Sequence, residues 1–113
     1  MELSYNGFGE STATFAVTDG VTAEMPVKMT ANGTVGACAA GDKFCGVALN
    51  TRGGYAAVQL SGYVRLPYTG TAPAIGYGNF SAAGENAIQI DAAGRELLVL
   101  DVDETGKTCG VIL

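Results

Sequence analysis

Short runs of alternating apolar and polar residues, separated by glycine-rich turns, dominate this chain. No apolar period of 3.6 residues is sustained over ten positions, so long helices are not expected. The alternation and the turn signals predict strands over residues 12–17, 25–29, 34–38, 44–49, 55–67, 87–91, 97–102 and 107–113. Short strands at this close spacing are typical of a sandwich or a barrel, so the sequence predicts an all-β fold.

The longest run, residues 55–67, alternates most regularly, with Gly62 in its middle. A glycine inside a strand pattern indicates a bulge or a sharp bend. One face of the run is apolar and the other carries mostly polar side chains; the two sets are Val58, Leu60, Val64 and Leu66, and Gln59, Ser61, Tyr63 and Arg65. The glycine clusters at 7–9, 53–54 and 76–78 are interpreted as turns, because they match no phosphate-binding motif.

The end of the chain resembles its middle. Residues 39–60 align without a gap on residues 92–113, and the apolar positions and glycines agree. A single hairpin has too little core to stand alone, but two related hairpins can bury their apolar faces together. The sequence therefore predicts one β domain over 12–113, built from two related hairpin units, preceded by an N-terminal arm or edge segment over 1–11.

The charge balance excludes several classes of function. The 113 residues carry a net charge of −5, and only 15% of them are charged. A nucleic-acid binder that neutralises phosphates needs a basic face, so no nucleic-acid partner is expected. No apolar run approaches the length that a membrane helix needs, so no membrane helix is expected. The start of the chain has neither a basic region nor an apolar one, so no secretory signal is expected either.

Candidate chemistry is sparse. The chain has no histidine, which excludes Ser-His and Cys-His nucleophile pairs. The three cysteines, Cys38, Cys45 and Cys109, match no zinc spacing and are expected to be reduced and mostly buried. The acidic stretch 101–106 resembles the start of a calcium loop but lacks the glutamate at its twelfth position, so it is interpreted as a solvated turn. The sequence predicts no catalytic residue, no cofactor and no metal site, and hence no enzyme.

Two groups of side chains are candidates for contact with another protein. Leu3, Tyr5 and Phe8 lie in a segment rich in glycine, asparagine and serine. That segment is either a frayed end with an anchoring ring or an arm that docks on a larger surface. Tyr63, Arg65 and Tyr68 lie on the long strand and are interpreted as a half-exposed polar-aromatic face or a subunit contact.

Five segments of the first two thirds of the chain together resemble a known family. They are Met25-Pro26-Val27-Lys28-Met29, Asn32-Gly33-Thr34-Val35, Ala40-Gly41-Asp42, Gly46-Val47-Ala48-Leu49, and residues 58–67 (VQLSGYVRLP). This pattern is similar to that of the small phage capsid decoration, or cement, proteins of the DUF2190 type. The resemblance covers roughly residues 5–113, although the second copy lacks the usual Gly-Asp-Pro turn and has VLDV in place of GVAL.

The resemblance implies a β-clip or β-tulip-like barrel that assembles as a homo-oligomer, a trimer by analogy. It implies a structural role on the outer capsid surface of a virion, where the subunit binds across neighbouring major capsid proteins and stabilises a phage or prophage head. Before assembly such a subunit would reside in the bacterial host cytoplasm. The alternatives are a small ligand- or carbohydrate-binding β module without catalysis, and an enzyme subunit on a β-clip-like scaffold.

Overall fold

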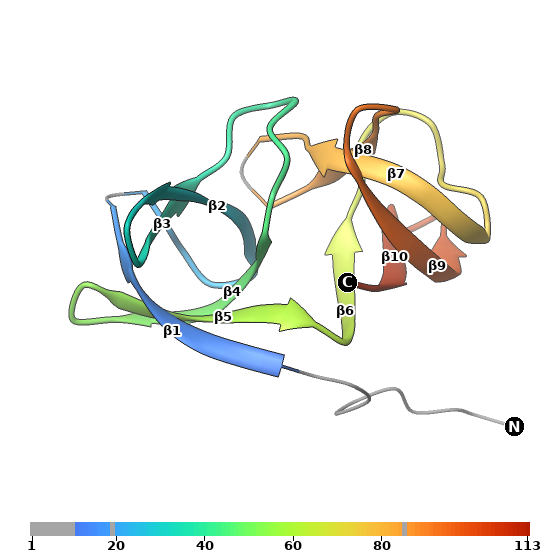
Figure 1. The fold of residues 1–113 in the computed structure, drawn as a ribbon. Helices are drawn as coiled ribbons and strands as arrows, with labels where there is room; N and C mark the ends of the chain where they lie inside the picture. Colours follow the sequence, from blue (N-terminus) through green and yellow to red (C-terminus); the bar gives the residue numbers. More distant parts are fainter. Residues whose placement is uncertain (1–10, 19, 85) are drawn as a thin grey trace, which may run out of the picture.

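The structure of the chain is a computed structural model that describes residues 11–18, 20–84 and 86–113. These residues form ten strands and no helix. Five strands close into a barrel, and the other five form a second sheet beside it (Figure 1). The predicted all-β barrel fold is therefore confirmed.

The first unit is the closed barrel, whose strands are β1 (Ser11–Val17), β2 (Met25–Ala31), β3 (Thr34–Ala37), β4 (Gly46–Arg52) and β5 (Tyr55–Ser61). The second unit contains β6 (Tyr63–Pro67), β7 (Gly76–Ala82), β8 (Ile88–Ile90), β9 (Arg95–Asp103) and β10 (Thr108–Ile112). Strand β7 was not predicted, because its first residues, Gly76-Tyr77-Gly78, were interpreted as a turn.

Both units have the same strand order. The neighbours run β1-β5-β4-β2-β3 in the first unit and β6-β10-β9-β7-β8 in the second. The pairing also agrees in register: Pro26 pairs with Val47 in the first unit, and Tyr77 pairs with Leu98 at the corresponding place in the second. The similarity of the two units in the structure thus extends over nearly the whole described chain.

The two long hairpins differ in the length of their turns. The turn between β4 and β5 consists of Gly53 and Gly54, whereas residues 104–107 connect β9 to β10. Each hairpin has a bulge, and the residue that bulges is Leu49 in one and Leu100 in the other. Because of the longer turn, the ungapped alignment of residues 39–60 on 92–113 is right only for the second strand of the hairpin. For the first strand it is out of register, since Val47 corresponds to Leu98 and not to Leu100.

The two units differ in how they close. In the first unit, β1 pairs with β3 in parallel and completes the barrel. In the second unit, a single parallel bridge between Tyr68 and Ile88 stands at the corresponding place. The backbone N–H of Thr69 also donates to the carbonyl of Ile88 at 3.0 Å. The second sheet is thus left open along most of the border between β6 and β8.

Side chains from the first unit fill the core of the second. Cys38, Phe44 and Val47 belong to the same buried cluster as residues of the second unit, namely Leu66, Tyr68, Phe80, Ala82, Ile88, Leu97, Val99, Cys109 and Val111. The barrel has a smaller core of its own, made of Val27, Val35, Ala48, Ala56 and Val58. The larger apolar core therefore belongs to both units.

Polar contacts hold the segment between β3 and β4 on the second unit. The N–H of Gly41 donates to the carbonyl of Ala82 at 2.8 Å, and the N–H of Ala82 donates to the carbonyl of Asp42 at 2.9 Å. The guanidinium of Arg95 donates to the carbonyl of Cys45 at 2.9 Å and lies 5.5 Å from the centroid of the Phe44 ring. Burial lowers the pKa of Arg95, and the ring and the carbonyl compensate part of that desolvation.

The chain passes from one unit to the other at Gly62. The predicted long strand 55–67 is in fact two strands in different sheets, joined at this glycine, whose φ is +94°. The predicted bend is therefore present, but residues 58–67 do not share one sheet. Gln59 was expected on the polar face, yet it is 3% exposed. Its amide Nε2 donates to the carbonyls of Ser61 at 3.1 Å and Tyr63 at 2.8 Å, so Gln59 holds the bend from the inside.

Replacing Gln59 by leucine tests this bend. Gln59→Leu keeps about the same buried volume but removes two hydrogen bonds of the buried amide, and each such bond contributes about 0.5–1.5 kcal/mol. We expect the free energy of unfolding, measured in urea, to fall by about 2 kcal/mol. The matched control is Gln89→Leu, because Gln89 is only half-buried and makes a single long bond of 3.4 Å to Ser81. A control variant as unstable as Gln59→Leu would contradict the proposed role of the amide.

Candidate functional site

The outward face of the second sheet carries an apolar row across four strands. Tyr77 pairs with Leu98, Leu98 with Ile112, and Ile112 with Tyr63. Side chains at directly paired positions point to the same face of a sheet, so these four lie side by side. Tyr77 is 74% exposed, and the other three are partly buried. We call these residues the outer row.

A polar pair lies next to the outer row. The Arg65 guanidinium donates from Nε to the hydroxyl of Thr108 at 3.1 Å and from a terminal nitrogen to Asp101 Oδ1 at 2.8 Å. The same carboxylate oxygen accepts the N–H of Gly110 at 3.0 Å. A Cβ at Gly110 would lie 2.7 Å from both Asp101 Oδ1 and the Tyr63 hydroxyl, so only glycine leaves room for this arrangement. The hydroxyl of Tyr63, followed by Asp101, raises the pKa of Arg65.

The sequence-predicted contact residues are placed differently from one another. Tyr63 and Arg65 lie together on the outward face, as expected. Tyr68 does not share it: its side chain is 5% exposed and packs into the common core, because the chain turns inward after Pro67 to form the bridge with Ile88. Leu3, Tyr5 and Phe8 lie outside the residues that the structure describes.

Three residues of the outer row were not singled out from the sequence. Leu98 and Ile112 were treated only as members of apolar strands, and Tyr77 was assigned to a turn. An alignment of the two hairpins by their first strands, β4 and β9, would have matched Leu98 with Val47. The same shift would have matched Tyr77 with Pro26, so both residues would have corresponded to apolar positions of the first unit. That alignment was the available signal, and the ungapped alignment of residues 39–60 on 92–113 obscured it.

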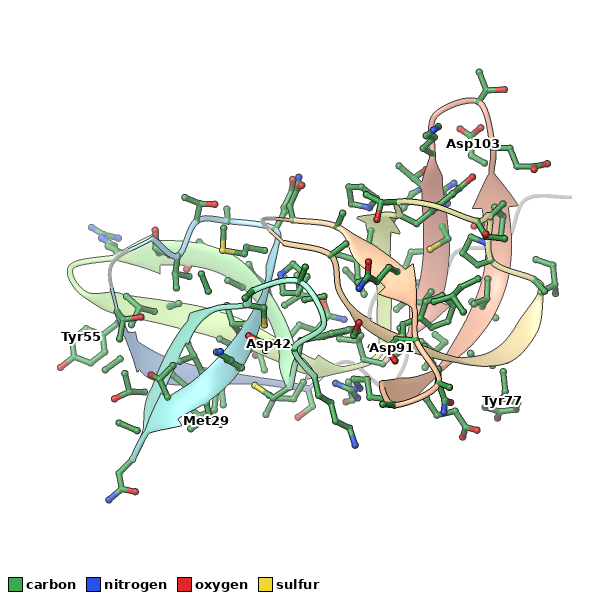
Figure 2. All side chains as sticks on the ribbon, turned by 90° about the horizontal axis from the view of Figure 1, so that it is seen from above. Met29, Asp42, Tyr55, Tyr77, Asp91 and Asp103 are labelled. Carbon is green, nitrogen blue, oxygen red and sulfur yellow. The ribbon has the colours of Figure 1, made fainter. Side chains whose placement is uncertain are left out.

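The acidic side chains of the described residues do not gather into one cluster. Asp103 Oδ1 accepts the N–H groups of Thr105 and Gly106, both at 3.1 Å, so it shapes the β9–β10 turn. Asp91 accepts the N–H of Ala93 at 2.9 Å, and this bond, followed by the Ser81 hydroxyl, lowers the pKa of Asp91. Figure 2 shows Asp103 at the tip of its hairpin, away from Asp91. Among the described residues, no group of three or more His, Cys, Asp or Glu side chains could hold a metal ion.

A groove of about 280 Å³ lies between the two units, lined by Glu24, Val47, Leu49, Tyr63, Val64, Arg65 and Leu66. Its described lining carries one carboxylate, that of Glu24, and one guanidinium, that of Arg65. A paired-carboxylate mechanism needs two carboxyl groups, so these described residues do not form such a pair. None of the described residues belongs to a helix that is long and apolar enough to cross a membrane.

The three cysteines are free. Cys38 and Cys109 are 7% and 0% exposed, and Cys45 is partly buried, which agrees with the expectation of reduced and mostly buried thiols. Burial raises the pKa of both Cys38 and Cys109 to about 11. Raised pKa values keep these thiols protonated at neutral pH, so they are poor nucleophiles.

No protein-family model matches this chain, and no curated protein matches it either.

The raised thiol pKa values predict an alkaline loss of stability. The thiols of Cys38 and Cys109 would titrate near their ordinary value of 9.0 in the unfolded chain and at about 11 in the folded one. Because the unfolded chain loses these protons first, their contribution is complete below pH 9 and is lost between pH 9 and 11.

The measurement is the free energy of unfolding in urea at pH 7.5 and pH 10.5. The double variant that carries Cys38→Ala and Cys109→Ala should lose markedly less stability between pH 7.5 and pH 10.5 than the unmodified chain does. Cys45→Ala should retain most of the pH dependence, because Cys38 and Cys109 remain. An equal loss in the double variant and the unmodified chain would show that the two thiols are not the cause.

Proposed function

We propose that this chain is a structural subunit of a virion, a decoration or cement protein that binds across neighbouring major capsid proteins on a phage or prophage head. The observation that carries the proposal concerns the segments that resemble the DUF2190-type proteins. Residues of these segments also connect the two β units. Gly41 and Asp42 pair with Ala82 of the second unit. Val47 is buried in the core common to both units, and Pro26, which pairs with it, is also buried. The pattern thus specifies a shape, as expected for a subunit whose role is structural.

Gly46 supports the same interpretation of the pattern. A Cβ at this position would lie 2.4 Å from the carbonyl oxygen of Gln59, so any larger residue would push β4 away from β5. That displacement would move Val47 out of the shared core and disturb the Gln59 amide at the bend. A rigid relation between the two units suits a protein that must fit a fixed surface, because little ordering entropy is then lost on binding.

The surface fits a binding role better than a catalytic one. The chain is acidic and carries few charges, and large apolar side chains are exposed on both units. Tyr55 and Met29 of the first unit are 58% and 47% exposed. Figure 2 shows Tyr55 and Tyr77 toward opposite ends of the molecule. We propose that the end with Tyr55 and Met29 contacts the capsid, because it is remote from the bend between the units and exposes two large apolar side chains.

The experiment that tests the proposal is co-sedimentation with expanded phage heads made without this protein. The purified chain should sediment with the heads saturably and raise the temperature at which they open. Light scattering of the free protein should give the mass of an oligomer, with a trimer expected. A chain that stays in the supernatant at micromolar concentration would overturn the proposed function.

A pair of tyrosine variants tests the proposed contact end. Tyr55→Asp should weaken head binding at least tenfold, about 1.4 kcal/mol, because a desolvated carboxylate would replace an apolar ring in the contact. Its melting temperature should stay close to that of the unmodified chain, since the ring is exposed. The matched control is Tyr77→Asp, at the other end, which should bind heads as the unmodified chain does. The reverse ranking would place the contact on the second unit.

A further inference from the structure

The groove between the two units runs along the free edge of a strand. Its lining includes Tyr63, Val64, Arg65 and Leu66, four consecutive residues of β6. Successive side chains of a strand point to opposite faces, so a groove that meets all four lies at the edge of the strand and not on one of its faces. On its other edge β6 pairs with β10. Figure 1 shows β6 at the side of the second sheet nearest the barrel.

The register of β6 turns backbone groups toward this groove. The N–H of Leu113 donates to the carbonyl of Gly62, and the N–H of Tyr68 donates to the carbonyl of Lys107, both at 3.0 Å. Antiparallel neighbours exchange such bonds at every second residue, so the even-numbered residues of β6 bond to β10. The N–H and C=O groups of the odd-numbered residues, Arg65 among them, therefore point to the groove.

Arg65 offers a backbone donor and a backbone acceptor at this edge. Of the other odd-numbered residues of β6, Pro67 has no N–H, and the carbonyl of Tyr63 already accepts the amide of Gln59 at 2.8 Å. Within the described part of the chain, no hydrogen bond engages the backbone N–H or C=O of Arg65. An extended segment beside β6 would take both bonds at once, as in peptide recognition by strand addition.

The walls of the groove favour an apolar side chain. Val47 and Leu49 of β4 line it on one side, and Val64 and Leu66 of β6 line it on the other. Leu49 is the residue that bulges from the β4–β5 hairpin, and it is 37% exposed. An apolar side chain of the added segment would therefore cover Leu49 and contact both units.

Glu24 gives the groove a negative charge. Its carboxylate takes part in no ion pair between described residues, whereas the guanidinium of Arg65 is already paired with Asp101 at 2.8 Å. The φ of Glu24 is +64°, which is uncommon for a residue other than glycine, and its N–H is held by the carbonyl of Ala48 at 2.6 Å. Backbone outliers of this kind gather at binding sites. A cation would complement the charge at this position.

We propose that the groove binds an extended segment of another protein, which adds a strand to the free edge of β6. The segment places an apolar side chain against Leu49 and a lysine or arginine beside Glu24. The two backbone bonds to Arg65 set its register, and the charge pair adds specificity. The proposal rests on the groove alone and not on the proposed role in a virion.

Selection from a library of random peptides displayed on yeast tests the proposal with the purified full chain. The enriched peptides should share an apolar residue close to a lysine or arginine. In NMR experiments, a saturating amount of the most enriched peptide should slow the hydrogen exchange of the Arg65 amide roughly tenfold or more, because this N–H becomes bonded.

Charge reversal tests the contact with Glu24. Glu24→Lys should weaken binding of that peptide at least tenfold, and a glutamate in place of the basic residue of the peptide should weaken binding to the unmodified chain as much. The two changes together should restore most of the affinity, because opposite charges face each other again. The matched control is Glu96→Lys, which makes the same change at an exposed position of β9 outside the groove and should bind the peptide as the unmodified chain does.

The change on the peptide side needs no protein variant, so it decides the question even if Glu24→Lys fails to fold. Failure of any peptide to enrich would overturn the proposal, as would an unchanged exchange rate of the Arg65 amide at saturation or an affinity that ignores the charge reversal. Slower exchange of this amide at higher protein concentration without peptide would identify a second copy as the occupant and would also overturn it. Head binding plays no part in these measurements.

Discussion

The shared core between the two β units is the constraint on which the rest of the structure depends. The second sheet is open along most of the border between β6 and β8, and Phe44 and Val47 of the first unit fill its core. The barrel itself buries only a small cluster of valines and alanines. Large apolar side chains contribute about 1.5–3 kcal/mol each on burial, so removing Phe44 and Val47 from this core would destabilise the second sheet. The two units therefore depend on each other.

Backbone geometry makes this shared core possible. Gly62 bends the chain so that β6 leaves the barrel (Figure 1). The buried amide of Gln59 donates to the carbonyls on either side of the bend. Gly94 serves a similar purpose in the second unit, because a Cβ there would lie 2.1 Å from the carbonyl oxygen of Phe80. Arg95 follows directly and reaches the Cys45 carbonyl. The bend at Gly62 and the donors of Gln59 and Arg95 thus help to fix the relative position of the units.

Much of the fold could be predicted from the sequence, because alternation and glycine turns locate most strands. Strand β7 was missed since Gly78 has no side chain and the ring of Phe80 lies over it, so the alternation is hidden. Alternation also carries no information on which sheet a strand joins, so the run through Gly62 was taken as one strand. For the candidate site, Tyr63 and Arg65 could be predicted, whereas the burial of Tyr68 depends on a bridge to Ile88 that is remote in sequence.

Native-state hydrogen exchange of Phe44→Ala tests the mutual dependence of the units most directly. Truncation of a buried phenylalanine costs about 3–5 kcal/mol, and this ring lies in the core common to both units. If the units unfold together, the slowest amides of β1 and β5 in the barrel should lose as much protection as those of β9 and β10. Protection lost in the second sheet alone, with β1 and β5 unchanged, would show that the barrel is stable by itself and would contradict the account.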